Sequence, residues 1–251
     1  MGLFSKKPSE NAQKIIDFLG CPCEYFPAGK SPEFIRSAYE EAYAKRVIGA
    51  YTPLLIVVDD VLIDTLEIQR DEMRDGETPE MFRQRLLSEA IPDAGKWFTE
   101  QLTEMREMSG EYWQQITQES GESGSGMNKL SGFVDFSTKK SMELILAKIP
   151  TEKPWEVFAW IPFGGWNECP DSSVMITVGK YWYEKFHSIP AVITHDVLEF
   201  VAAPVKDKGA AVGLALEQYA FCSDIVDQGV QTIEVLADTL SKSSVWYFWW
   251  D

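Results

Sequence analysis

The sequence has few of the features that mark secreted, membrane-bound or nucleic-acid-binding proteins. Its 251 residues include only four cysteines and no apolar run of signal-peptide or membrane-span length. Basic residues are also scarce, with 23 Lys and Arg against 39 Asp and Glu, and the net charge of −16 repels phosphate backbones and anionic lipid heads. We therefore expect a cytoplasmic protein that binds neither nucleic acid nor membrane.

Signatures of several enzyme classes are missing as well. There are only two histidines and no Gly-x-Ser-x-Gly motif, which excludes serine hydrolases with a catalytic triad. No glycine-rich phosphate loop is present, and no arginine follows Arg106, so the second half lacks the planar group that binds phosphate with two hydrogen bonds. We expect no cofactor and assign no metal ligands.

The composition is that of a folded protein. Hydrophobic residues make up 45% of the chain and aromatic residues 13%. A chain of this length buries about 70% of its surface on folding, which is enough for a sizeable core. Residues 1–8 are expected to be a frayed end.

Capping residues and helical periodicity predict helices in the first half. Ser9 can cap a helix that ends before Gly20. Pro32 opens a second helix that ends at Gly49, and Pro79 opens another, since proline is favoured in the first turn of a helix.

Apolar runs predict strands between these helices. Residues 23–26 form a short run, and residues 54–58 are almost wholly aliphatic, as in a buried strand. Asp59 and Asp60 indicate a turn, after which residues 61–68 are expected to return as another strand.

A Gly- and Ser-rich stretch, residues 119–128, has the composition of a flexible linker or loop. It divides the chain into an expected N-terminal α/β unit, residues 1–118, and a C-terminal α/β domain, residues 129–251. Within the second unit a helix should begin at Asp171 or Ser172. Strands are expected at residues 133–136, 142–149, 157–163, 191–194 and 197–200.

The two halves share an order of elements. A proline leads a strand in each, Pro53 and Pro190, and an Asp-Val-Leu tripeptide follows in each, at 60–62 and 196–198. The expected fold is therefore α/β (mixed α+β), with two related strand-helix-strand-strand-helix units. A chance match of common α/β elements would give the same pattern.

The chain ends in an aromatic run, residues 245–250, which should be a central or well-covered strand. We expect this strand to close the mixed sheet of the second unit. Five consecutive aromatic side chains left in water would promote aggregation, so the run should be covered.

Three strings in the second half are unusual: GGWNECP at 164–170, YAFCSDIVDQG at 219–229 and WYFWWD at 246–251. With HDVLE at 195–199, they resemble the bacterial domain-of-unknown-function family 4253 over about residues 154–251, and the first half resembles it only loosely. The resemblance implies a bacterial, intracellular protein. It implies no activity, so no catalytic residue can be transferred from the family.

Cys169 is one candidate for catalysis. It precedes the expected helix start, where free backbone amides and the helix dipole favour a thiolate. Cys222 could then form a disulfide bond with Cys169. The alternative is that both cysteines are inert core residues. The Cys21-Pro22-Cys23 pair is closer than common zinc-ligand spacings and is interpreted as two loop cysteines.

Polar side chains of the second half form the other candidate site. The residues that could perform acid/base chemistry, or bind a divalent cation, are Glu168, His195, Asp196, Glu199, Asp224 and Asp227. A ligand-binding role is assigned to Trp166, Asn167, Cys222, Asp224, Asp227 and Gln228. The alternatives are structural: a turn at His195-Asp196, a helix cap at Asp224 and a core position for Trp166.

Two functions fit these observations. The one we favour is a non-catalytic, immunity-like binding protein whose acidic surface recognises a basic protein partner or a small molecule. The other is a small-molecule enzyme with a thiol or carboxylate site around Cys169, Asp196 and Asp227. A pocket at Trp166 and Cys169 would favour the enzyme.

Overall fold

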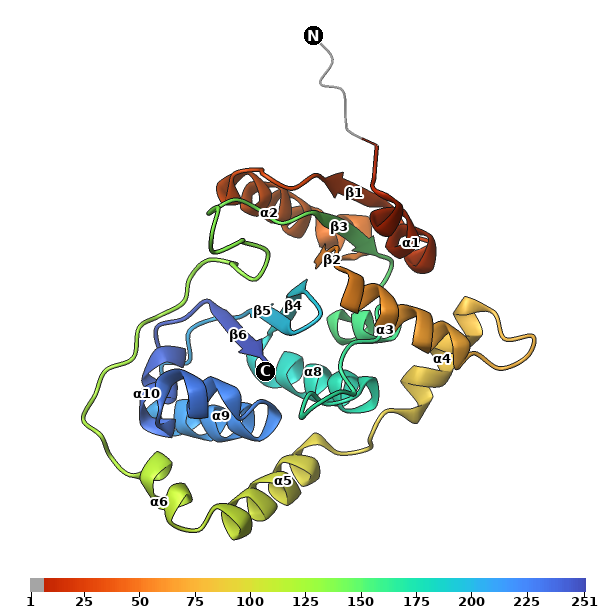
Figure 1. Cartoon of the computed structure of the whole chain (residues 1–251). Coiled ribbons are helices and arrows are strands. Elements are labelled where there is room, and N and C mark those ends of the chain that lie inside the picture. The colour runs from red at the N-terminus through yellow and green to blue at the C-terminus, as the bar shows by residue number, and fades with distance from the viewer. Residues whose placement is uncertain (1–6) are drawn as a thin grey trace.

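The computed structural model describes residues 7–251, so most of the expected frayed end lies outside it. These residues form one mixed, open six-stranded sheet in the order β1-β3-β2-β4-β5-β6, with helices on both faces (Figure 1). The expected α/β class is confirmed. The strands are β1 (Cys23–Phe26), β2 (Thr52–Val57), β3 (Leu144–Ile149), β4 (Ile189–Ile193), β5 (Val197–Val201) and β6 (Val245–Trp249).

The helices expected after Ser9, from Pro32 and from Pro79 are confirmed. The side chains of Ser9, Ser31 and Thr78 each accept a hydrogen bond from a backbone N–H three residues on. The α-helices are α1 (Glu10–Leu19), α2 (Pro32–Gly49), α3 (Asp60–Asp71), α4 (Pro79–Glu89), α5 (Ala94–Ser109), α6 (Glu111–Thr117), α7 (Val157–Trp160), α8 (Ser172–Phe186), α9 (Lys208–Phe221) and α10 (Ile233–Leu240). A short 3₁₀ helix η1 (Pro154–Glu156) and a π-helix η2 (Ile225–Val230) complete the set. No helix in residues 7–251 is both long and apolar enough to cross a membrane.

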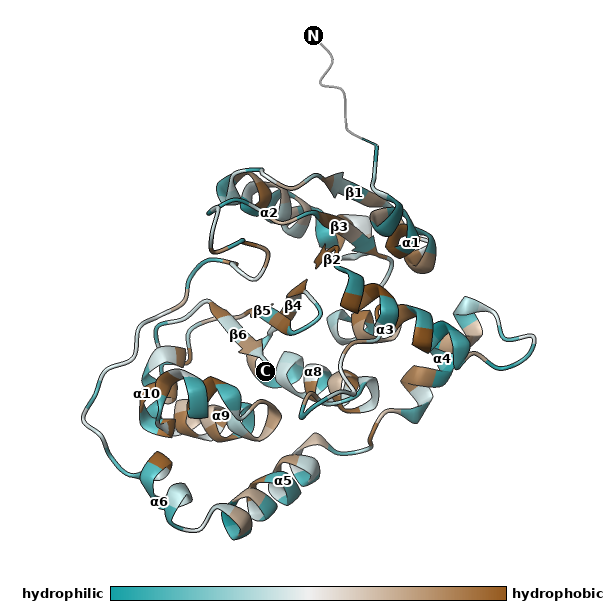
Figure 2. Cartoon of the chain, viewed as in Figure 1, coloured by the Kyte–Doolittle hydropathy of each residue, from teal (hydrophilic) through white to brown (hydrophobic). Residues whose placement is uncertain are grey.

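The parallel pair β2 and β4 lies at the centre of the sheet. All other strand pairs are antiparallel. Side chains of β2 alternate between two cores: Leu54 and Ile56 pack with α8, and Leu55 and Val57 pack with α2. Helices α2 and α8 therefore cover opposite faces, and the strands between them are mostly hydrophobic (Figure 2).

Strands from both expected units share this sheet. β3 follows residues 119–128 in the chain, yet it lies between β1 and β2. The stretch 119–128 therefore does not separate two sheets. It lies along α10: Glu234 accepts hydrogen bonds from the backbone of Ser120 and Gly121, and Asp238 accepts one from Gly124.

The expected strand at residues 61–68 is wrong, because this segment is helix α3. Asp59 accepts a hydrogen bond from the Leu62 N–H at 2.7 Å, which caps the helix, and Leu62, Ile63 and Leu66 bury one side of it. The matching tripeptide at 196–198 leads into strand β5. The similarity between the two halves therefore ends at the Asp-Val-Leu positions.

Two other expected strands are also absent. Residues 157–163 begin with helix α7 instead. Within 133–136 the only β pairing is a single bridge between Val134 and Ser141. Of the expected strand 142–149, the part from Leu144 to Ile149 forms.

The aromatic C-terminus forms β6, an edge strand and not a central one. It is nevertheless well covered, because Trp246, Phe248 and Trp250 are buried. Trp182 of α8 packs against Trp246 and Phe248, with ring centroids 5.6 Å apart in both pairs. β6 therefore completes the larger core without closing the sheet.

Candidate functional site

A cavity of about 1300 Å³ lies at the carboxyl ends of β2 and β4. Helix α2 precedes β2 and helix α8 precedes β4, and these two helices cover opposite faces of the sheet. In the sheet, β2 is followed on one side by β3, and β4 is followed on the other side by β5. In open α/β sheets, the crevice at such a reversal of strand order is where ligands bind. We call this cavity the switch-point cleft.

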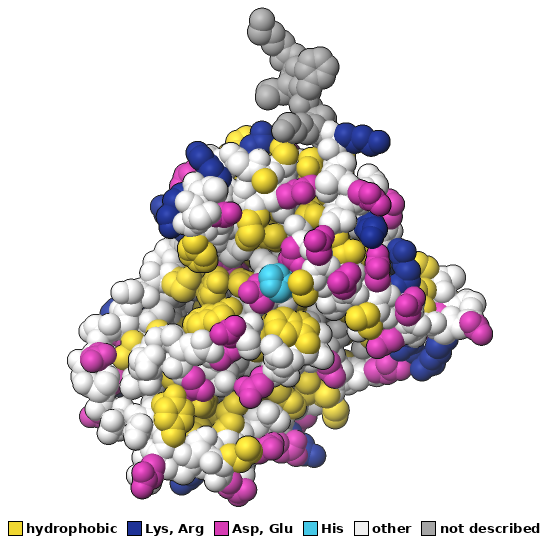
Figure 3. Space-filling view, viewed as in Figure 1, with side chains coloured by type: hydrophobic (Ala, Val, Ile, Leu, Met, Phe, Trp, Pro, Cys, Tyr) yellow, Lys and Arg dark blue, Asp and Glu magenta, His cyan; other side chains and the backbone are white. Residues whose placement is uncertain are grey.

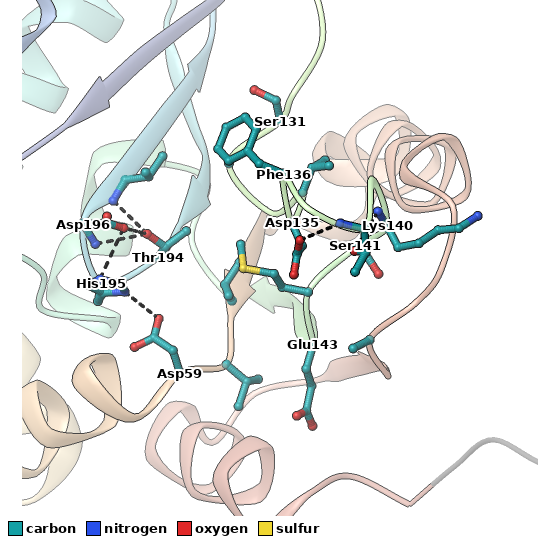
Figure 4. A pocket seen from close by; sticks show the side chains of 18 of the residues that line it. Asp59, Ser131, Asp135, Phe136, Lys140, Ser141, Glu143, Thr194, His195 and Asp196 are labelled. Carbon is teal, nitrogen blue, oxygen red and sulfur yellow. Dashed lines mark hydrogen bonds and ion pairs between the residues drawn. The ribbon is translucent and has the colours of Figure 1, made fainter. Parts of the chain in front are cut away.

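The walls of the switch-point cleft are largely apolar. They come from the ends of β2 and β6 and from the loop 131–142, which faces the β4–β5 turn across the cavity (Figure 4). The apolar lining residues are Ala28, Val57, Val58, Met127, Val134, Phe136, Met142, Val197, Tyr247 and Trp249. Polar side chains line the cavity on two sides. Near the ends of β2 and β4 these are Asp59, Glu143, Thr194, His195 and Asp196, and on the loop 131–142 they are Ser131, Asp135, Thr138, Lys140 and Ser141.

Asp59 and His195 are in direct polar contact at the edge of the cleft. Asp59 Oδ2 lies 3.1 Å from His195 Nδ1, while Asp59 Oδ1 accepts the capping hydrogen bond of α3. Because the cap holds the carboxylate, Asp59 can orient the imidazole with its Nδ1–H toward Oδ2. The ring Nε2 then lies 3.7 Å from Asp196 Oδ1.

The β4–β5 turn holds Asp196 in place. Thr194 Oγ1 donates a hydrogen bond to Asp196 Oδ1 at 2.7 Å and accepts one from the Val197 N–H at 2.8 Å. His195 and Asp196 therefore do form a turn, as the structural alternative states, and the same turn presents both side chains to the cleft.

Glu199 lies beneath the cleft and not in it. Its side chain is fully buried, and both carboxylate oxygens accept a hydrogen bond from the Ser131 N–H at 3.0 Å. Burial raises the pKa of Glu199 to about 7, despite these hydrogen bonds. Glu199 thus anchors the start of the loop 131–142.

The rest of that loop is held by its own hydrogen bonds. Asp135 accepts bonds from Ser137 Oγ and from the backbone of Ser137 and Thr138, and these bonds lower its pKa to about 2. The buried Ser141 Oγ accepts a bond from the Lys30 N–H. The loop therefore forms an ordered wall, on which Phe136 remains 76% exposed.

Two of the expected site residues, Asn167 and Asp224, are bonded to the last residue, Asp251, and Gln228 and Glu168 lie next to them. Asn167 Nδ2 donates to the Asp251 carbonyl at 3.2 Å, and the Asp251 N–H donates to Asp224 Oδ2 at 3.1 Å. Gln228 Nε2 donates to Asp224 Oδ1 at 2.9 Å, and Glu168 accepts a bond from Ser223. The segments 166–170 and 222–228 are thus neighbours.

Asp224 and Asp227 have other contacts than the sequence indicates. The π-helix η2 has no side-chain cap. Asp224 therefore does not cap a helix, and its carboxylate accepts a hydrogen bond from the Asp251 N–H instead. Asp227 accepts a hydrogen bond from Tyr112 Oη at 2.8 Å. These carboxylates do not line the switch-point cleft.

The two second-half cysteines are buried and free. Burial, and then the nearby Cys222, raise the pKa of Cys169, which is opposite to the shift that a helix N-terminus favours. Burial also raises the pKa of Cys222 to about 12, and its Sγ donates to the Trp249 carbonyl at 2.9 Å. Neither thiol lines the switch-point cleft.

Trp166 lines a different cavity, of about 740 Å³, between α3 and the Gly164-Gly165 turn. Cys169 does not line that cavity. Within residues 7–251, no group of three or more His, Cys, Asp or Glu side chains has the arrangement of a metal site.

Sequence reasoning missed several residues of the switch-point cleft, among them Asp59, Ser131, Glu143 and Tyr247. Asp59 was expected only to form a turn. Its position directly after a buried strand was a usable signal, because the carboxyl ends of parallel strands carry ligand sites. That signal depends on knowing that β2 pairs in parallel with β4.

The comparisons with known proteins name one family. Residues 145–251 match the family model described as "Domain of unknown function (DUF4253)". No curated protein and no solved structure matches the chain. The matched region contains His195, Asp196 and β6, while Asp59 and the loop 131–142 precede it. The second half of this chain is therefore similar to the DUF4253 family, in agreement with the strings at 164–170, 219–229 and 246–251.

Proposed function

We propose that this chain is a binding protein whose switch-point cleft takes a small organic ligand with an apolar body and a cationic end. The observation that carries the proposal is the composition of one cavity. Apolar side chains form most of its walls, and three carboxylates, of Asp59, Glu143 and Asp196, gather near the ends of β2 and β4. Ligand sites commonly combine an apolar lining with a few convergent polar groups.

The charges of the lining favour a cation. Among the ion pairs of residues 7–251, none joins Asp59, Glu143 or Asp196 to a lysine or arginine. Lys140 is the one lysine of the lining, and it belongs to the opposite loop. Asp59 and Asp196 lie beside His195, and Glu143 accepts a hydrogen bond from Tyr25 Oη. An ammonium group would add a permanently charged partner to these carboxylates.

The arrangement supports binding better than it supports the thiol enzyme. Cys169 and Cys222 are buried away from the cleft, and Asp227 is bonded to Tyr112. An enzymatic alternative rests on the Asp59–His195 pair alone. In that alternative Asp59 orients the imidazole, and Nε2 accepts a proton from a bound substrate or water.

The proposal can be tested with three indole compounds of similar size: tryptamine, which is cationic, tryptophol, which is neutral, and indole-3-acetate, which is anionic. Binding to the full chain is measured by calorimetry at pH 7.5. We expect tryptamine to bind more tightly than tryptophol and indole-3-acetate not to bind. Asp196→Asn should weaken tryptamine binding at least tenfold.

The matched control is Glu40→Gln, which removes an exposed carboxylate of α2 outside the cleft. It should leave tryptamine affinity unchanged. Equal binding of the cation and the anion, or no effect of Asp196→Asn, would show that the cleft does not select a cationic ligand.

A further inference from the structure

The second cavity, of about 740 Å³, is a groove along α3 that the proposed ligand does not use. Its apolar lining comes from α3, α4 and the turn before α8. These residues are Val61, Ile68, Leu86, Pro162 and Trp166. Four acidic side chains, Asp64, Glu72, Glu89 and Asp171, also line it, and no lysine or arginine does. We call it the α3 groove.

Helix α3 has apolar residues on two sides. One side buries Leu62, Ile63 and Leu66 in the core. On the other side, Val61 is 53% exposed and Ile68 is 60% exposed. These two residues are seven positions apart, so they lie on the same face of the helix, about two turns apart.

Single exposed apolar residues are common on protein surfaces. Val61 and Ile68 differ from that ordinary case, because they line one cavity together with the half-buried Trp166. A tryptophan and an aliphatic pair on one groove form the type of lining that accepts the apolar face of a helix.

The acidic groups of the α3 groove are not equally available. Asp171 caps α8, and Glu89 is paired with Arg74 and Arg85. The side chains of Asp64 and Glu72 make no hydrogen bond or ion pair with any other residue of 7–251. Figure 3 shows acidic side chains gathered over α3, with hydrophobic side chains exposed between them.

We propose that the α3 groove docks an amphipathic basic helix of a partner protein. The apolar face of that helix packs on Val61, Ile68 and Trp166, and its Lys or Arg side chains pair with Asp64 and Glu72. Complementary charge raises the association rate and fixes the orientation of such a complex, and the net charge of −16 adds long-range attraction. This interaction is independent of the ligand proposed for the switch-point cleft.

The probe for the test is a fluorescein-labelled 18-residue peptide made only of leucine and lysine, with leucines at helical spacing. Its affinity for the full chain is measured by fluorescence anisotropy at low salt. We expect the double variant Val61→Ser/Ile68→Ser to weaken binding at least tenfold, and Asp64→Asn/Glu72→Gln to weaken it by a similar factor.

Each variant has a matched control. Val47→Ser/Ile48→Ser removes two apolar side chains of α2 that are 69% and 94% exposed. Glu104→Gln/Glu107→Gln removes two exposed carboxylates of α5. Both controls should bind the peptide as the parent chain does, and a peptide of the same composition with scrambled order should bind weakly.

Three results would overturn the proposal. They are no binding of the ordered peptide, equal binding of the scrambled peptide, and equal weakening by the control variants. The last two would indicate non-specific attraction to an acidic surface. Tryptamine affinity of Val61→Ser/Ile68→Ser, measured in parallel, separates this result from any failure of the cleft proposal.

Discussion

Asp59 and His195 lie 136 residues apart in the sequence, yet Asp59 Oδ2 is 3.1 Å from His195 Nδ1. Each residue follows one of the two central parallel strands, Asp59 after β2 and His195 after β4. Parallel pairing brings the carboxyl ends of these strands to the same edge of the sheet. The contact therefore joins the first half of the chain to the half that resembles the DUF4253 family.

Asp59 should be needed for stability as well as for the position of His195. Asp59→Ala removes the N-cap of α3 and should lower the free energy of unfolding by about 1 kcal/mol. Asp59→Asn should retain most of that stability, because asparagine also caps helices well. Urea unfolding of both variants checks this, and an equal loss in both would show that the cap contributes little.

The stability of the protein should depend on pH through Glu199. Its pKa of about 7 lies above the ordinary value of 4.5, so between these values the folded state holds a proton that the unfolded state releases. The stabilising contribution is fully present below about pH 4.5 and is lost as the pH rises through about 7.

Glu199→Gln isolates this effect, because glutamine has a similar shape and does not titrate. The free energy of unfolding of the parent chain, relative to Glu199→Gln, should fall by on the order of 3 kcal/mol between pH 4.5 and pH 7.5. Urea unfolding across this pH range is the measurement. A difference that stays constant with pH would mean that Glu199 does not titrate there.

The four thiols should differ in reactivity. The neighbouring Cys23 thiol and then Arg83 lower the pKa of the half-buried Cys21, whereas burial raises the pKa of Cys169 and Cys222. Iodoacetamide at pH 7 should therefore label Cys21 first in the native protein, as measured by mass spectrometry of its peptides. Cys169 and Cys222 should react only in urea. Rapid native labelling of Cys169 would restore the thiol-enzyme hypothesis.

The aromatic strand β6 should be required for folding. Phe248 is fully buried and stacks on Trp182 at an interplanar angle of 9°. Phe248→Ala should cost about 3–5 kcal/mol, and deletion of residues 246–251 should give insoluble or molten protein. Phe136→Ala, at a side chain 76% exposed, is the control and should change stability by less than about 0.5 kcal/mol. Urea unfolding and solubility measure these effects, and a soluble truncated chain of unchanged stability would contradict the prediction.

Several elements were predictable because the interactions that define them are local. The N-caps at Ser9, Ser31 and Thr78 join groups three residues apart, and the apolar run before Asp59 forms β2 as expected. The aromatic composition of residues 245–250 likewise implied a covered strand, since such a segment is costly to leave in water.

The two Asp-Val-Leu tripeptides mark where local reasoning fails. The one at 60–62 begins α3, and the one at 196–198 enters β5, which pairs with both β4 and β6. Val197 and Leu198 gain strand partners from segments that are close only in the folded chain. A β-strand obtains its hydrogen bonds from other segments, so three residues of sequence do not determine it.

The sequence by itself determined the starts of α1, α2 and α4, the buried strand β2, the acidic charge and the family resemblance of the second half. The tertiary structure decided that β3 inserts between β1 and β2, that β2 lies parallel to β4, and that Asp59 meets His195. It also separated Cys169 from the cleft that contains Asp196. The reason is physical: caps and periodicity act over a few residues, whereas strand pairing and a shared cavity depend on which distant segments bury their apolar faces together.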